Sequence, residues 1–239
     1  MSVPDPSVKG SAGGGTVSPA RIQPATGHED SLILSYLALR KAIGLLGMTL
    51  PLVVSVGAGI LFQTGIRSSI SGYYYTGMRD VFVGTLCAIG VFLFSYRGYE
   101  RSDDIAGDLA CVFAIGVALF PTARDDPAAA DAGLIGQLHL AFAALFFLTL
   151  MYFSLFLFTK TDPTKRPTRR KLQRNKVYKA CGYTMGLCLL LIVVYSLVPT
   201  DAAVVLRDLH SLFWLEAVAI VAFGISWGTK GEAILKDEV

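Results

Sequence analysis

The chain has few charged residues, and this limits the classes of protein to which it can belong. Only 16% of its 239 residues are charged, 53% are hydrophobic, and the mean hydropathy is +0.55. These values lie on the apolar side of those typical of soluble domains. No polar stretch is long enough to form a separate soluble domain with its own activity.

Several chemical signatures are also missing. The four cysteines occur without a C-x-x-C pair, and no H-E-x-x-H or G-x-S-x-G motif is present. This excludes a recognisable disulfide or metal framework and a standard serine nucleophile. All four cysteines fall within apolar segments and are predicted to be small packing residues: Cys87, Cys111, Cys181 and Cys188. No internal repeat with matching motifs occurs.

Six apolar stretches are each about long enough to cross a bilayer. They begin near residues 42, 81, 105, 133, 180 and 210, and segments 42–62, 132–159 and 180–200 contain no charge. Continuous apolar runs argue against a barrel, whose strands alternate apolar and polar residues. We therefore predict an all-α polytopic bundle of six transmembrane helices over residues 31–229. Glycines such as Gly44 and Gly47 are predicted to mark close helix contacts.

The flanking segments are predicted to be tails. Residues 1–30 lack the apolar core of a signal peptide and include the low-complexity run GSAGGGTVSP, which predicts a disordered cytoplasmic tail. Residues 230–239 are predicted to form a short cytoplasmic C-terminal tail.

The distribution of basic residues predicts the orientation. With both termini cytoplasmic, 17 of the 21 Lys and Arg residues lie in inside segments and 4 in outside loops. Basic loops near helix ends resist translocation, so this arrangement is favoured. We expect a multi-pass protein of the bacterial inner membrane.

Nine of these basic residues lie in one loop, residues 160–179, which begins with Lys160 and ends with Lys179. Without aromatic or motif support the cluster does not indicate nucleic-acid binding. We interpret it as a topology determinant that also attracts anionic lipids of the inner leaflet. The alternative is a docking site for a cytoplasmic protein partner of unknown identity.

Two ionisable residues lie inside predicted spans, where such groups usually have a partner or a task. His139 lies about six residues, roughly 9 Å, below the outer end of its predicted helix, and Glu216 lies at a similar depth in the last one. We hypothesise that they form the floor of an outward-facing ligand pocket. Four more polar residues are predicted at that level: Gln137, Tyr195, Ser196 and Gln63.

The loop QTGIRSSISGYYYTGMRD, residues 63–80, is predicted to lie above this pocket. In one interpretation its tyrosines sit at the membrane interface and its end starts a helix. In the other it forms the pocket rim, with Arg79 meeting an anionic group or Glu216. The hypothesised rim residues are Ser69, Ser71, Tyr73, Tyr74, Tyr75, Arg79 and Asp80.

A metal site is the weaker alternative, and we predict no cofactor. Imidazole and carboxylate groups on the outer side could hold zinc: His139, His210, Glu216 and Asp80. However, His210 and Glu216 are six residues apart, about 240° around a helix, and do not share a face.

The runs SISGYYYTGMRDVFVGTLCAIGVFLFSYRGYE, DLACVFAIGVALFPT and FWLEAVAIVAFGISWGTKGE resemble an uncharacterised bacterial family of multi-pass membrane proteins, over about residues 69–232. The resemblance implies a helical bundle and no particular activity. The grouping of Ser, Asp, His and acidic residues is also distantly similar to membrane hydrolases of the ceramidase and adiponectin-receptor class. Those have seven spans and a paired-histidine motif in the last one, where this chain has His210 and Glu216.

The sequence therefore leads us to expect an integral membrane protein whose outward-facing polar pocket binds a lipid headgroup or small polar ligand. An enzyme is not the favoured interpretation. The alternatives are a metal-dependent lipid hydrolase, a proton-coupled transporter, and a structural or assembly protein.

Overall fold

The computed structural model describes residues 26–98, 100–123, 133–161, 167–199 and 204–235, with side chains from Tyr36 onward. Throughout this part of the chain the regular structure is helical, and no strand occurs. The predicted all-α class is confirmed. The elements in chain order are α1 (Thr26–Phe62), η1 (Ser71–Tyr75), α2 (Arg79–Phe94), α3 (Arg101–Leu119), α4 (Gly133–Tyr152), η3 (Phe153–Leu157), α5 (Arg169–Leu197), α6 (Val204–Asp208) and α7 (Ser211–Lys230).

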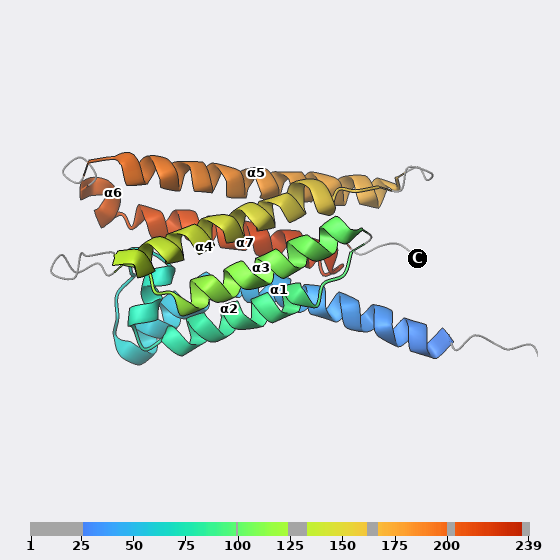
Figure 1. Cartoon of the computed structure of the whole chain (residues 1–239), viewed down its shortest axis with the longest axis horizontal. Helices are drawn as coiled ribbons and strands as arrows, with labels where there is room; N and C mark the ends of the chain where they lie inside the picture. The colour runs from blue at the N-terminus through green and yellow to red at the C-terminus, as the bar shows by residue number, and fades with distance from the viewer. Residues whose placement is uncertain (1–25, 99, 124–132, 162–166, 200–203, 236–239) are drawn as a thin grey trace, which may run out of the picture.

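The long helices α1, α2, α3, α4, α5 and α7 lie side by side and alternate in direction along the chain (Figure 1). One end of the bundle, on the left of the figure, carries η1, the end of α3 and the starts of α4 and α7. We call it the η1 end. The opposite end carries the starts of α1, α3 and α5 and the end of α7, and we call it the Trp227 end.

Four of these helices are long and apolar enough to cross a membrane, judged by length and composition alone. They cover Tyr36–Phe62, Gly133–Leu157, Arg169–Leu197 and Ser211–Lys230 within the described residues. Helices α2 and α3 do not meet the same criterion, because α2 has 16 residues and α3 carries Asp103, Asp104 and Asp108. Six transmembrane helices therefore remain a prediction.

Helix α1 begins at Thr26, inside the segment predicted as a disordered tail. The rest of that predicted tail, residues 1–25, lies outside the described residues. At the other terminus α7 ends at Lys230, where the C-terminal tail is predicted to begin.

Helix α7 packs against both α1 and α5. Its contact with α1 is built from glycines, because a methyl group on Gly44 would lie only 2.6 Å from the backbone nitrogen of Gly228 and 2.9 Å from the Gly224 carbonyl oxygen. Gly47 likewise faces the ring of Phe223. The predicted close contact at Gly44 and Gly47 is confirmed, and it allows the two backbones to approach.

Helix α4 continues into η3, a π-helix. The wider turn is marked by the N–H of Phe158, which donates to the carbonyl of Phe153, five residues earlier, at 2.9 Å. Within it, the fully buried hydroxyls of Ser154 and of Ser226 on α7 form a hydrogen bond of 2.8 Å. This polar contact ties α4 to α7 inside an apolar core.

Candidate functional site

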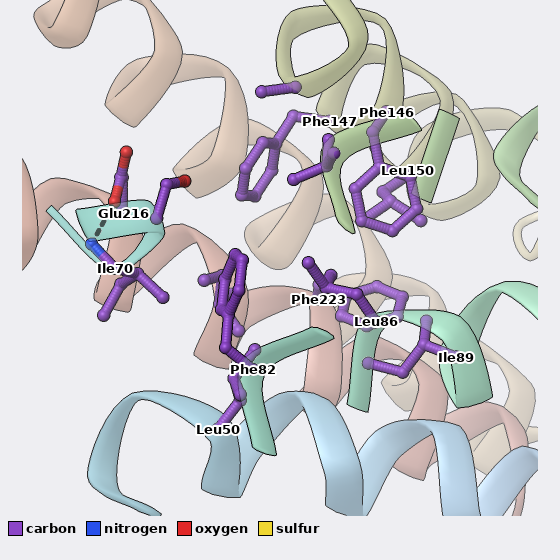
Figure 2. Close-up of a pocket in the computed structure, with 14 residues that line it drawn as sticks. Leu50, Ile70, Phe82, Leu86, Ile89, Phe146, Phe147, Leu150, Glu216 and Phe223 are labelled. Carbon is purple, nitrogen blue, oxygen red and sulfur yellow. Dashed lines mark hydrogen bonds between the residues drawn. The ribbon is translucent and has the colours of Figure 1, made fainter. Parts of the chain in front are cut away.

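Glu216 lies in the second turn of α7, at the η1 end of the bundle. One of its carboxylate oxygens, Oε2, accepts a hydrogen bond of 2.6 Å from the backbone N–H of Ile70, and the backbone of Ser71 is a second partner. Figure 2 shows this contact, with the segment before η1 lying across the carboxylate. A carboxylate that accepts from a backbone N–H makes a strong, charge-assisted hydrogen bond, so Glu216 fixes this loop to α7.

Glu216 also lines a small cavity of about 50 Å³ between α1, α2, α3, α4 and α7. The side chains around it are mainly aromatic and aliphatic, and Figure 2 shows them pointing into the space between the helices. That volume suits water or one small group. The lining residues are Leu50, Ile70, Ser71, Phe82, Leu86, Ile89, Val117, Ala143, Phe146, Phe147, Leu150, Glu216, Ile220 and Phe223.

The loop over Glu216 is well packed. The hydroxyl of Ser69 accepts a hydrogen bond of 3.0 Å from the N–H of Gly72, and Tyr73 is fully buried with its ring edge against Phe213. The phenol oxygen of Tyr73 accepts from the N–H of Arg67 at 3.4 Å. Burial raises the pKa of this phenol above its ordinary value of 10.0, so its hydroxyl stays neutral at physiological pH. This folded loop covers the η1 end of the bundle.

The other predicted rim residues point to separate partners. Arg79 donates a hydrogen bond of 2.7 Å to the hydroxyl of Tyr74, and its guanidinium carbon lies 4.4 Å from the centre of that ring. The hydroxyl of Tyr75 donates to the carbonyl of Thr122 at 2.7 Å, and Asp80 is exposed in the first turn of α2. Arg79 thus lies with Tyr74. One interpretation of the sequence had it meeting an anionic group or Glu216.

His139 is buried, with 5% of its surface exposed. Its Nδ1 lies 2.6 Å from the carbonyl oxygen of Phe120, the residue that ends α3. Because a carbonyl only accepts, the proton of this bond must sit on Nδ1. His139 therefore joins the start of α4 to the end of α3, and it is not among the residues that line the cavity.

The remaining predicted pocket residues also lie away from the cavity. Gln63, Gln137 and Ser196 are exposed, and Tyr195 is partly buried. Ser196 donates to the carbonyl of Val193 in its own helix at 2.8 Å. Of the six residues hypothesised for the pocket, the structure places Glu216 in the cavity wall, joined by Ser71 from the rim.

Among the residues that the structure describes, no group of three or more His, Cys, Asp or Glu side chains is placed to hold a metal ion. His210 precedes α7 in a left-handed conformation with φ of 50°, where it turns the chain into the helix. All four cysteines are free thiols.

The Trp227 end contains a polar cluster that the sequence analysis missed. Asp103, on the first turn of α3, is almost fully buried, and its side chain forms a reciprocal capping box with Glu100. The ammonium of Lys160 lies 3.3 Å from the Asp103 carboxylate and 3.0 Å from that of Glu100. Burial disfavours the charged form of Lys160, but hydrogen bonds and attraction to the two carboxylates outweigh burial and raise its pKa.

Beneath this cluster, aromatic rings pack against one another at steep angles. Tyr96, Phe153 and Phe158 surround Trp227, with ring centroids 5.0 to 5.4 Å from that of its indole. The guanidinium of Arg40 lies 5.4 Å from the centre of the Tyr96 ring. The signal for this end was present in the sequence, because aromatic and basic residues alternate in SYRGYE and in ISWGTK, a pattern typical of helix ends at an interface.

Comparisons of the chain with protein-family models, with curated proteins and with solved structures find no match. The bundle geometry and its two polar ends therefore carry the functional argument.

Proposed function

We propose that this protein is a six-span integral membrane protein of a bacterial inner membrane, with both termini on the cytoplasmic side. Helices α2 and α3 lie alongside the four long apolar helices (Figure 1), and their lengths of 16 and 19 residues correspond to about 24 and 28 Å. A hydrocarbon core is about 30 Å thick, so both nearly cover it.

The outward faces of α2 and α3 support this topology. Val91 and Phe94 on α2 are 53% and 51% exposed, and Val112 on α3 is 57% exposed. Large apolar side chains exposed in this number suit contact with lipid better than contact with water. The basic start of α5 and the end of α7 lie at the same end of the bundle, as the positive-inside rule requires for one cytoplasmic side.

At the η1 end, Glu216 is proposed to bind a lipid headgroup or small polar ligand that donates hydrogen bonds. The observation that carries this proposal is the 2.6 Å bond from Ile70 to a carboxylate that also faces a cavity. An ammonium or hydroxyl group could replace the Ile70 N–H as donor. Because the cavity holds only about 50 Å³, ligand binding would move Ile70 and η1 away from Glu216 and enlarge the cavity.

Short-chain phospholipids with ethanolamine, choline or glycerol headgroups provide the test. We expect at least one to raise the thermal unfolding midpoint of the detergent-solubilised protein. Glu216→Gln should abolish that increase, since an amide keeps the size but loses the charge. The matched control is Asp80→Asn, an exposed carboxylate at the same end, which should respond like the wild type. An unchanged response in Glu216→Gln, or no response of the wild type to any headgroup, would contradict the proposal.

A further inference from the structure

A second and larger hollow runs along the outside of the bundle, between α1, α5 and α7. Its volume is about 520 Å³, and its walls are predominantly apolar. On α7 it extends from Phe213 to Ile225, about 18 Å at 1.5 Å per residue. We call it the α7 groove, and it is lined by Met48, Pro51, Leu52, Ser55, Ile66, Ala180, Cys181, Thr184, Phe213, Trp214, Ala217, Val218, Val221, Ala222 and Ile225.

On α1 and on α5, a basic residue lies in line with the residues that face the groove, on the side toward the Trp227 end. Lys41 precedes the groove residue Met48 by seven positions on α1, and Arg174 precedes Cys181 by seven on α5. Seven residues are close to two full turns, so each basic residue lies on the same helix face as the groove residue it precedes.

The structure brings these two positions toward each other. The guanidinium of Arg174 lies 3.7 Å from the carboxylate of Glu232, just beyond the end of α7. The neighbouring Gly231 packs against the backbone of α1, where an added methyl group would lie 2.8 Å from the nitrogen of Lys41. The side chains of Glu232 and Arg174 and the backbone of Lys41 therefore lie close together where the groove faces the Trp227 end.

We propose that the α7 groove binds one phospholipid with an anionic headgroup, its acyl chain along α7 and its phosphate between Lys41 and Arg174. The charge at this end favours an anion, because the start of α5 is strongly basic and Lys41 is exposed on α1 at the same end. A phosphate group can take bidentate hydrogen bonds from a guanidinium as a carboxylate does. The lipid phosphate thus competes with Glu232 for Arg174. This site lies apart from Glu216 and goes beyond the proposed function of the η1 end.

The two tryptophans of the chain make the groove directly observable. Trp214 lines the groove and is 54% exposed, while Trp227 is fully buried in the aromatic core. Brominated acyl chains quench the fluorescence of an indole that they touch. The protein is reconstituted into vesicles of phosphatidylcholine with a minor fraction of either brominated phosphatidylglycerol or brominated phosphatidylcholine. Trp214→Phe gives the background from Trp227.

We expect brominated phosphatidylglycerol to quench Trp214 more than brominated phosphatidylcholine at equal fraction. Lys41→Gln and Arg174→Gln should each lower this preference about fivefold, the effect of one basic residue at an anionic lipid. Glu232→Gln should increase the preference, because it removes the competing carboxylate. Arg101→Gln is the matched control, since Arg101 is exposed at the same end and belongs to α3, which does not line the groove.

Equal quenching by the two lipids would overturn the proposal and leave the groove as a site for any acyl chain. So would a loss of preference in Arg101→Gln as large as in Arg174→Gln. Arg174→Gln combined with Glu232→Gln, which leaves no unpaired carboxylate, covers the case in which Arg174→Gln alone does not fold. A preference in this double variant as strong as that of Glu232→Gln alone would also overturn it. The outcome is independent of Glu216, whose variants should retain the lipid preference.

Discussion

The two ends of the bundle handle polar groups in different ways. At the η1 end three polar side chains contact different groups: Glu216 the backbone of Ile70 and Ser71, His139 the carbonyl of Phe120, and Arg79 the phenol of Tyr74. At the Trp227 end the charged groups share partners. Lys160 reaches both Glu100 and Asp103, and Asp103 also caps α3.

This difference indicates where the structure can move. Separate contacts can be broken one at a time. A shared network laid over packed aromatic rings loses several contacts when one member is removed. We therefore expect that the proposed ligand would move the η1 end more than the Trp227 end.

The largest test of this comparison replaces the tryptophan at each end. Trp227→Ala should lower the free energy of unfolding by about 3–5 kcal/mol, because it empties the centre of the aromatic core. Trp214→Ala, which removes a half-exposed ring near the η1 end, should cost less than about 1 kcal/mol. Denaturant titration in detergent micelles measures both. Similar losses in the two variants would show that the ends are equally rigid.

The next test compares carboxylates. Asp103→Asn should lower the free energy of unfolding by about 3 kcal/mol, since it leaves Lys160 without its buried partner. Asp80→Asn at the η1 end should cost less than about 1 kcal/mol, because that side chain is exposed and acts on α2 only through the helix dipole. The same titration checks both, and a cost for Asp103→Asn no larger than that for Asp80→Asn would refute the shared network.

The smallest expected effect is a pH dependence carried by Lys160. Its pKa is raised in the folded protein, so its stabilising contribution is complete below the ordinary lysine pKa of 10.5 and is lost as pH rises through the higher folded value. Lys160 is partly exposed, which limits the contribution to about 1 kcal/mol. The difference in unfolding midpoint between wild type and Lys160→Gln should shrink above pH 10.5. A constant difference would mean that its charge is not stabilising.

The helices were predictable from sequence because their signal is local. The uncharged runs 42–62, 132–159 and 180–200 lie almost entirely within α1, α4 with η3, and α5, since burial of continuous apolar surface decides those segments without reference to the rest of the chain. The contact at Gly44 followed from the same kind of local reasoning. The early start of α1 was not predicted from the sequence, because residues 26–30 are polar and have no apolar periodicity.

The candidate site was predictable only in part. Glu216 was identified because an acidic residue in an apolar helix is conspicuous, but its partner is the backbone of Ile70, and a backbone group leaves no trace in the sequence. His139 has the right depth, yet the direction of its ring depends on where the end of α3 lies. Depth along a helix can be counted from residues, whereas rotation about its axis depends on packing.

The π-helical turn Phe153–Leu157 affects how side chains are placed at the Trp227 end. Each residue of a regular helix advances the chain by about 100° around the axis, so one extra residue in a turn re-aims every side chain that follows by that amount. Phe158, which contacts the indole of Trp227, and Lys160, which contacts Asp103, both follow this turn, so the offset sets the direction of their side chains. The extra residue in one helical turn thus sets the alignment of the ion pairs that Lys160 makes at the Trp227 end.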